Sequence, residues 1–296
     1  MIKRTLVISN AFHLETQHEQ LVLKSKETNQ VNKIPIENIG YLVIENQRVG
    51  ITIPTLQKLS ENNVAVIFCN AKHAPCSMLL NLDGHHIQQE RFRAQLNATK
   101  PLHKQLWLQT IKAKINNQAA LLQMQSKNIE SLITFSKNVQ SGDSTNREAL
   151  AAKYYWKHLI EAPNFTRERF GAAPNPQLNY GYTILRAATA RALIGVGLLP
   201  TLGIHHHNRY NDFCLADDIM EPFRPFVDQI VLNIIKDYGL NDELSKEEKQ
   251  ELLQILTVDV HVEEQIKPLM IALNQTASSL RKCFEGESRK LIYPQL

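Results

Sequence analysis

Several motifs that mark common enzyme classes are absent from this 296-residue sequence. It contains no G-x-S-x-G nucleophile turn and no Walker loop for nucleotide phosphates. The glycines of Gly195–Gly197 run into Leu-Leu-Pro, so they do not complete a G-x-G-x-x-G dinucleotide motif. These absences argue against a serine hydrolase, a P-loop nucleotidase and a dinucleotide-dependent enzyme.

Cysteine is scarce, with four residues at Cys69, Cys76, Cys214 and Cys283, and no C-x-x-C pair. A zinc ribbon and a thioredoxin-like redox site are therefore not indicated. Four scattered thiols in a chain of this length are typical of a reducing compartment and of buried free cysteines. A zinc site that combines Cys214 with nearby histidines remains open, but it needs further ligands that the sequence does not supply.

Long apolar runs are missing as well. The longest near the middle, Ala192–Ile204, is interrupted by Pro200 and is shorter than the roughly 20 residues of a membrane helix. Lys3 and Arg4 precede "TLVIS", which is too short for the apolar part of a signal peptide. We therefore expect a cytoplasmic protein with no membrane partner.

Acidic residues are absent from Arg91 to Ile129, a segment with seven basic ones. These are Arg91, Arg93, Lys100, Lys104, Lys112, Lys114 and Lys127. A basic segment of this length is able to contact DNA phosphates, but it also fits an ordinary solvated helix face. The formal charge of +4 is only mildly basic and leaves both interpretations open.

The hydrophobic pattern predicts an α+β chain with two domains, and 43% hydrophobic residues suffice for a buried core. Short β-branched runs, such as "RTLVIS", "EQLVLKS", "GYLVIEN" and "NVAVIFCN", predict a small β-rich domain over residues 1–75, with one helix in "IPTLQKLSENN". From about residue 87, apolar residues recur every three or four positions. This indicates a linker over 76–86 and a larger, mainly α-helical domain over 87–296.

The stretch "GIHHHNRYNDFCLADDIMEPFRP" brings three consecutive histidines close to Asp218 and Glu221. On a helix, a spacing of three residues places both carboxylates on one face. Carboxylates suit Mg²⁺, and an added imidazole shifts the preference toward Mn²⁺ or another transition metal. The alternative is that both acids face solvent and that Glu221 pairs with Arg224.

Glu148 is a further candidate carboxylate, in "STNREALAAKYYW". Thr145 and Glu148 match a capping box, in which Glu148 would cap its own helix instead of binding a metal. Capping and metal ligation use the same carboxylate oxygens, so the two roles compete.

Three segments in order, "NPQLNYGYTILRA", a glycine three residues before His206, and "LADDIMEPFRPFVDQ", carry a family likeness. Over essentially the whole chain, the sequence resembles the CRISPR-associated spacer-acquisition integrase and endonuclease, most of all its type II form. The resemblance implies a metal site formed by Glu148, His206 and Glu221, with Asp218 alongside as a further catalytic acid. His206 is chosen over its two neighbours by its spacing from Gly203.

The resemblance also implies a metal-dependent enzyme that inserts short DNA fragments into a repeat array by transesterification, and that cleaves DNA when water is the nucleophile. It implies a homodimer formed through the β-rich domain, joined to a small ferredoxin-like partner in a heterohexamer on double-stranded DNA. The candidate DNA contacts are Arg91, Arg93, Lys104, Arg186 and Arg224. Two other functions remain open at this point: a non-catalytic DNA-binding scaffold, and a zinc-dependent hydrolase of small substrates.

Overall fold

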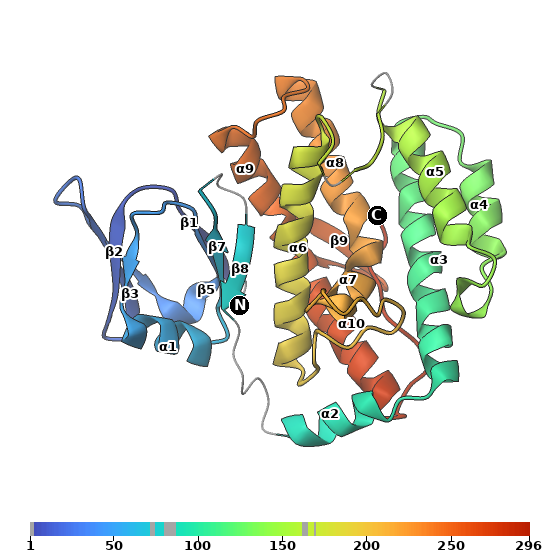
Figure 1. Cartoon of the computed structure of the whole chain (residues 1–296), viewed down its shortest axis with the longest axis horizontal. Coiled ribbons are helices and arrows are strands. Elements are labelled where there is room, and N and C mark those ends of the chain that lie inside the picture. Colours follow the sequence, from blue (N-terminus) through green and yellow to red (C-terminus); the bar gives the residue numbers. More distant parts are fainter. Residues whose placement is uncertain (1–2, 72–74, 80–86, 162–164, 169) are drawn as a thin grey trace. The chain divides into compact units, whose positions relative to one another are not determined.

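The computed structural model describes residues 3–71, 75–79, 87–161, 165–168 and 170–296. It divides the chain into two compact units, Met1–His86 and Ile87–Leu296 (Figure 1). The second unit begins at the residue where the sequence predicts the start of the helical domain. Among the described helices, none combines the length and the apolar character needed to cross a membrane.

One four-stranded sheet of the N-terminal unit has the order β1-β5-β7-β8. Its strands are β1 (Arg4–Ile8), β5 (Ile39–Ile44), β7 (Ala65–Cys69) and β8 (Pro75–Leu79). The first three are parallel, and β8 pairs antiparallel with β7. Every residue of β5 is buried, as expected for a central parallel strand covered on both faces.

The second sheet of this unit has the order β4-β3-β2-β6. Its strands are β2 (Phe12–Gln17), β3 (Gln20–Ser25), β4 (Val31–Pro35) and β6 (Gly50–Ile51). His18 and Glu19 join β2 to β3 with positive φ angles of 47° and 59°, as a two-residue hairpin turn requires. The predicted helix is present as α1 (Ile53–Glu61), and a short 3₁₀ turn, η1, spans Ile36–Asn38. Leu14, Leu21 and Leu59 meet in the fully buried core.

The predicted end of the first domain, at residue 75, falls at the start of β8. This strand belongs to the sheet of the N-terminal unit, so the unit includes residues that the sequence assigns to the linker. The remainder of that predicted linker, residues 80–86, lies outside the described residues.

The C-terminal unit is mainly helical, and the predicted α+β class is confirmed. Its helices are α2 (Gln88–Leu96), α3 (Lys100–Met124), α4 (Glu130–Lys137), α5 (Arg147–Leu159), α6 (Asn175–Gly195), α7 (Cys214–Met220), α8 (Arg224–Tyr238), α9 (Lys246–Leu253) and α10 (Leu269–Phe284). Three 3₁₀ turns accompany them: η2 (Ser141–Asp143), η3 (Glu221–Phe223) and η4 (Gln254–Leu256). A small hairpin, β9 (Asp259–Val262) and β10 (Gln265–Pro268), was not predicted.

Two long helices position the site. Helix α3 has 25 residues and follows the N-cap residue Thr99, whose hydroxyl accepts a hydrogen bond from Leu102 N. Helix α6 has 21 residues and contacts α7, α8, α9 and α10 (Figure 1). A helix buried on most sides must be apolar nearly all round, and α6 is lined with alanine, leucine and isoleucine.

Candidate metal centre

Two carboxylates from distant parts of the chain meet at one buried ammonium group. Glu148 lies in the first turn of α5 and Glu221 opens η3. Lys114 extends from α3 between them, with its Nζ 2.7 Å from Glu148 Oε1 and 2.6 Å from Glu221 Oε2. Burial lowers the pKa of Lys114, but the Glu221 and Glu148 carboxylates outweigh it and raise the pKa above its ordinary value. Lys114 therefore carries a positive charge at neutral pH.

The cap of α5 leaves the Glu148 side chain available. The predicted capping box is wrong, because the N-cap residue is Asn146, which caps with no side-chain hydrogen bond. Instead, the Asp143 carboxylate accepts hydrogen bonds from the backbone N–H groups of Arg147 and Glu148, at 2.8 and 3.0 Å. Thr145 Oγ1 is buried and has no hydrogen-bond partner among the described residues. Since Asp143 satisfies the helix end, the Glu148 carboxylate is not needed there.

Glu221 sits at a bend between two helices. Helix α7 ends at Met220, η3 contains Pro222, and α8 begins at Arg224. Arg224 Nε donates to Glu221 Oε1 at 2.7 Å, and the Glu221 side chain is only 8% exposed. Burial alone would raise the pKa of Glu221, but Arg224 and Lys114 lower it to about 2. The ion pair between Glu221 and Arg224 that the alternative interpretation predicts is thus present. However, the Glu221 side chain is buried and does not face solvent.

Asp218 orients His206. Its side chain is fully buried, and its carboxylate accepts a hydrogen bond from His206 Nδ1 at 2.5 Å and one from His205 N at 2.8 Å. The hydrogen bond to Asp218 raises the pKa of His206 against the effect of burial. In the neutral ring, a carboxylate acceptor at Nδ1 favours the tautomer with the proton on Nδ1, and this tautomer keeps the Nε2 lone pair for a ligand bond.

Gly203 is required by the close packing of this loop. A Cβ atom at this position would lie 2.3 Å from the His206 carbonyl oxygen and 2.9 Å from Asp218 Oδ2. Both distances are far below van der Waals contact, so any side chain would push the loop away from Asp218. The glycine three residues before His206 therefore has a direct steric explanation.

The three consecutive histidines have different surroundings. His205 stacks on Trp107, with ring centroids 4.2 Å apart and an interplanar angle of 2°. The edge of His206 faces the same indole at 5.6 Å. All three histidines are exposed, and the partial burial of His205 lowers the pKa of its imidazole. The imidazole held by a buried carboxylate is that of His206. Its role as a metal ligand stays a prediction.

The donor set suits a divalent cation, although the described residues contain no His, Cys, Asp or Glu group already gathered as an ion site. Lys114 Nζ occupies the space between the two carboxylates. Glu221 Oε2 is buried and accepts no hydrogen bond with adequate angles from the described residues, even though the ammonium is close. Two carboxylates and one imidazole match the preferences of Mg²⁺ or Mn²⁺. Cys214 does not extend this set toward zinc, because its thiol donates to Asn208 O and Asn211 O.

A buried tyrosine–carboxylate network lies beside Arg224. Asp228 of α8 accepts hydrogen bonds from Tyr155 at 2.7 Å and from Tyr182 at 2.5 Å. The Arg224 guanidinium lies 4.4 Å from the centre of the Tyr182 ring. Burial raises the pKa of Asp228 to about 6, although both tyrosine hydrogen bonds oppose the rise. The network fixes the arginine that holds Glu221.

Comparison with known proteins identifies the family. The family model described as CRISPR associated protein Cas1 matches residues 5–259. The chain belongs to the Cas1 family. The CRISPR-associated endonuclease Cas1 of Neisseria meningitidis serogroup C (strain 8013) is 36% identical over 294 residues, which cover 99% of this chain and 95% of that protein.

Solved structures show the same fold. A casposase bound to its integration product matches with a TM-score of 0.80 and 20% identity, over 98% of this chain and 92% of that one. A chain of a Cas6-RT-Cas1–Cas2 complex matches with a TM-score of 0.76 and 21% identity, over 99% of this chain and 36% of that one. At such identities, these likenesses establish the fold of this Cas1 family member and leave its residue roles to the site itself.

The five predicted DNA contacts of this Cas1 family member fall into two groups. Arg91 is buried, donates to Val196 O at 2.8 Å and pairs with Glu285 at 3.3 Å, so its placement does not suit a phosphate contact. Arg224 is committed to Glu221 and Tyr182. Arg91 and Arg224 are therefore engaged in contacts within the protein.

The other three candidates reach the surface. Arg93 and Lys104 are exposed. Arg186 is 39% exposed and forms a bidentate pair with Asp217 at 2.6 and 3.0 Å. The basic residues between Arg91 and Ile129 therefore do not all lie on one DNA-facing surface. Arg91 and Lys114 are buried, whereas Arg93 and Lys104 are exposed.

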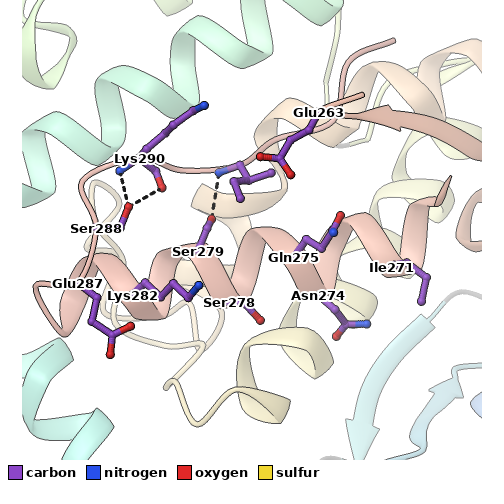
Figure 2. Close-up of a pocket in the computed structure, with 11 residues that line it drawn as sticks. Glu263, Ile271, Asn274, Gln275, Ser278, Ser279, Lys282, Glu287, Ser288 and Lys290 are labelled. Carbon is purple, nitrogen blue, oxygen red and sulfur yellow. Dashed lines mark hydrogen bonds between the residues drawn. The ribbon is translucent and has the colours of Figure 1, made fainter. Parts of the chain in front are cut away.

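A separate groove of about 600 Å³ lies along α10 (Figure 2). Asn274, Ser278 and Lys282 line it from the helix, and Lys290 lines it from the C-terminal segment. None of the candidate metal ligands faces this groove. Its mixed polar lining does not resemble the apolar pockets that enclose small substrates.

Proposed function

We propose that this Cas1 family member is a divalent-metal-dependent DNA endonuclease and integrase that inserts short DNA fragments into a CRISPR repeat array. The observation that supports this proposal most directly is that Glu148 and Glu221 both contact one buried cation, Lys114. His206 belongs to the same cluster, because both carboxylates act on its pKa. The names of the Neisseria endonuclease and of the casposase with its integration product support this assignment.

The proposed reaction is a balanced exchange of phosphodiester bonds. The 3′-hydroxyl oxygen of the fragment attacks a phosphorus atom of the repeat strand, and one P–O bond forms as another breaks. The attacking hydroxyl loses a proton, and the leaving 3′-oxygen of the repeat gains one. Water in place of the 3′-hydroxyl gives strand cleavage by the same chemistry. Since neither route needs a protein nucleophile, the absence of a nucleophile motif is consistent with the proposal.

Glu148, His206 and Glu221 would hold the divalent ion. When bound, such an ion supplies positive charge that favours the deprotonated hydroxyl and offsets charge on the scissile phosphate. Asp218 holds His206 in the tautomer with Nε2 unprotonated, and the Trp107 indole restricts the neighbouring imidazoles. The bound state therefore depends on residues that are already oriented by the fold.

We also propose that the chain acts as a homodimer through its β-rich unit, with a small ferredoxin-like partner completing a heterohexamer on double-stranded DNA. The Cas6-RT-Cas1–Cas2 complex supports the idea of a partner protein. Arg93, Lys104 and Arg186 are the candidates for phosphate contact, since all three reach the surface.

Glu221→Gln tests the proposed function in a strand-transfer assay with a labelled fragment, a repeat-bearing duplex and Mn²⁺. The amide keeps the shape but removes the charge of a ligand. We expect strand transfer to fall at least about 100-fold, because even residues that only support metal ligands typically cost 10–100-fold. DNA binding, measured by fluorescence anisotropy, should remain. Glu243→Gln, at an exposed acid on the surface, is the matched control and should behave as the unmodified protein.

The same experiment separates the enzyme from the DNA-binding scaffold. Unchanged strand transfer by Glu221→Gln would leave the carboxylate as a structural ion-pair partner and reject the enzymatic role. DNA binding with no strand transfer by any version of the protein, with the partner protein and Mn²⁺ present, would favour the scaffold.

A further inference from the structure

The candidate metal centre is electrically balanced by the chain itself. Glu148 and Glu221 carry two negative charges, and Lys114 and Arg224 carry two positive ones, all joined by contacts of 2.6–2.7 Å. The side chains of Lys114 and Glu221 are only 11% and 8% exposed, so water screens these charges weakly. In this arrangement the carboxylates have no excess negative charge to offer a divalent ion.

Lys114 also occupies the space that an ion would need. Its Nζ lies within hydrogen-bond distance of an oxygen from each carboxylate. A divalent ion that used the same oxygens would be close to a positive ammonium in a poorly screened environment, where like charges repel strongly. Ion binding therefore requires the ammonium to move away, or a further negative charge to enter.

The backbone that carries Lys114 is fixed to the turn that carries Glu221. Asn117, one helical turn further along α3, donates through Nδ2 to Pro222 O at 2.8 Å and to Pro294 O at 3.0 Å. These hydrogen bonds hold the backbone of α3 in place near Lys114. The part that is able to move is therefore the flexible Lys114 side chain. DNA phosphate is the anion that the proposed function brings to this place.

We propose that Lys114 is a positioning residue that neutralises the ligand carboxylates until DNA arrives, and thereby couples divalent-ion binding to DNA binding. This inference rests on the proposed function. A phosphate next to the site compensates the charge of the ion and gives the lysine ammonium a new partner. Coupling of this kind is reciprocal, so the ion strengthens DNA binding by the same factor.

Mn²⁺ titrations followed by electron paramagnetic resonance test this coupling, with and without a short duplex that ends in 3′-dideoxynucleotides and cannot undergo strand transfer. The signal of free Mn²⁺ reports binding, and DNA alone is titrated for subtraction. The proteins compared are the unmodified chain, Lys114→Met, Lys114→Arg and the control Lys112→Met. Lys112 is a half-buried lysine two residues away on the same helix.

For the unmodified chain, we expect DNA to lower the Mn²⁺ dissociation constant by about tenfold or more, the scale of coupling between close charges. Lys114→Met should bind Mn²⁺ without DNA about tenfold more tightly than the unmodified chain and gain little from DNA. Lys114→Arg and Lys112→Met should keep the coupling. A lysine with only a structural role would not restrain metal binding, so its loss would not tighten it.

Equal or weaker Mn²⁺ binding by Lys114→Met would overturn the inference, and so would an Mn²⁺ affinity of the unmodified chain that DNA does not change. The latter comparison needs no variant, and Lys114→Gln replaces Lys114→Met if the methionine variant fails to fold. The two proposals fail separately. If strand transfer occurs but DNA does not change Mn²⁺ affinity, only the proposed role of Lys114 is rejected. If Glu221→Gln binds Mn²⁺ as tightly as the unmodified chain, the proposed metal centre itself is rejected.

Discussion

Gly203→Ala is a small change that should have a large effect on the site. The new Cβ would lie 2.3 Å from the His206 carbonyl oxygen, 2.9 Å from Asp218 Oδ2 and 3.1 Å from Cys214 Cβ. The loop must retreat by roughly 1 Å to reach ordinary contact distances, and overpacking of this kind costs about 1–3 kcal/mol. For a unit of this size, that loss lowers the melting temperature by roughly 2–12 °C.

This movement of the loop carries His206 away from the Asp218 carboxylate that orients it. Strand-transfer activity should therefore fall even at temperatures where the variant stays folded. A displacement of about 1 Å near reacting groups is able to cost about 100-fold in rate. Strand transfer measured well below the melting temperature, together with calorimetry, separates the two effects. Thr201→Ala, at an exposed position of the same loop, is the control. Normal activity and stability in Gly203→Ala would refute the steric explanation of the glycine.

Three further predictions concern charge. Asp218→Asn removes the carboxylate that holds the imidazole and should weaken Mn²⁺ binding about 10–100-fold, measured by titration; unchanged affinity would contradict its orienting role. The pKa of Glu221 is lowered from 4.5 to about 2, so its charge stabilises the fold by roughly 3 kcal/mol above pH 4.5 and this contribution is lost as pH falls toward 2. Urea unfolding at several pH values should therefore show a smaller acid loss for Glu221→Gln than for the unmodified chain, and parallel losses would argue against the shift. Replacing Arg93 and Lys104 together by glutamine should flatten the salt dependence of DNA binding by about two units of slope, whereas Arg91→Gln should lower stability and leave the slope unchanged; the reverse pattern would place the DNA surface elsewhere.

Sequence patterns predicted the elements whose signal is local and strong. The β-branched runs that predict strands correspond to β1, β3, β5 and β7, and α1 lies where the three-residue spacing places it. Among the strands that were missed, β4 and β8 lie at sheet edges, and three and two of their five residues, respectively, are exposed. Strand β2 was missed as well, although it pairs with a strand on each side. Pairing with a neighbouring strand defines them, and a local pattern does not record that pairing.

The site was predicted in part because its histidine and acids lie in distinctive motifs. The role of Lys114 was not predicted, although Lys114 lies in the segment Arg91–Ile129 that lacks acidic residues. Nothing in the neighbouring sequence distinguishes a buried lysine from a solvated one. Asp143 was hidden because the Thr145 motif offered a more regular helix cap. Asp228 left a weak signal, as a single acid among the apolar positions of α8. The roles of Lys114 and Asp228 arise from contacts between distant segments, whereas Asp143 caps a helix only a few residues away in the sequence.

Anomalous diffraction from crystals grown with Mn²⁺ and DNA would locate the ion itself. We expect one Mn²⁺ peak held by Glu148, His206 Nε2 and Glu221, with the Lys114 ammonium withdrawn from the two carboxylates. A Mn²⁺ peak at another place, or these three side chains directed to separate surfaces with DNA bound, would contradict this expectation.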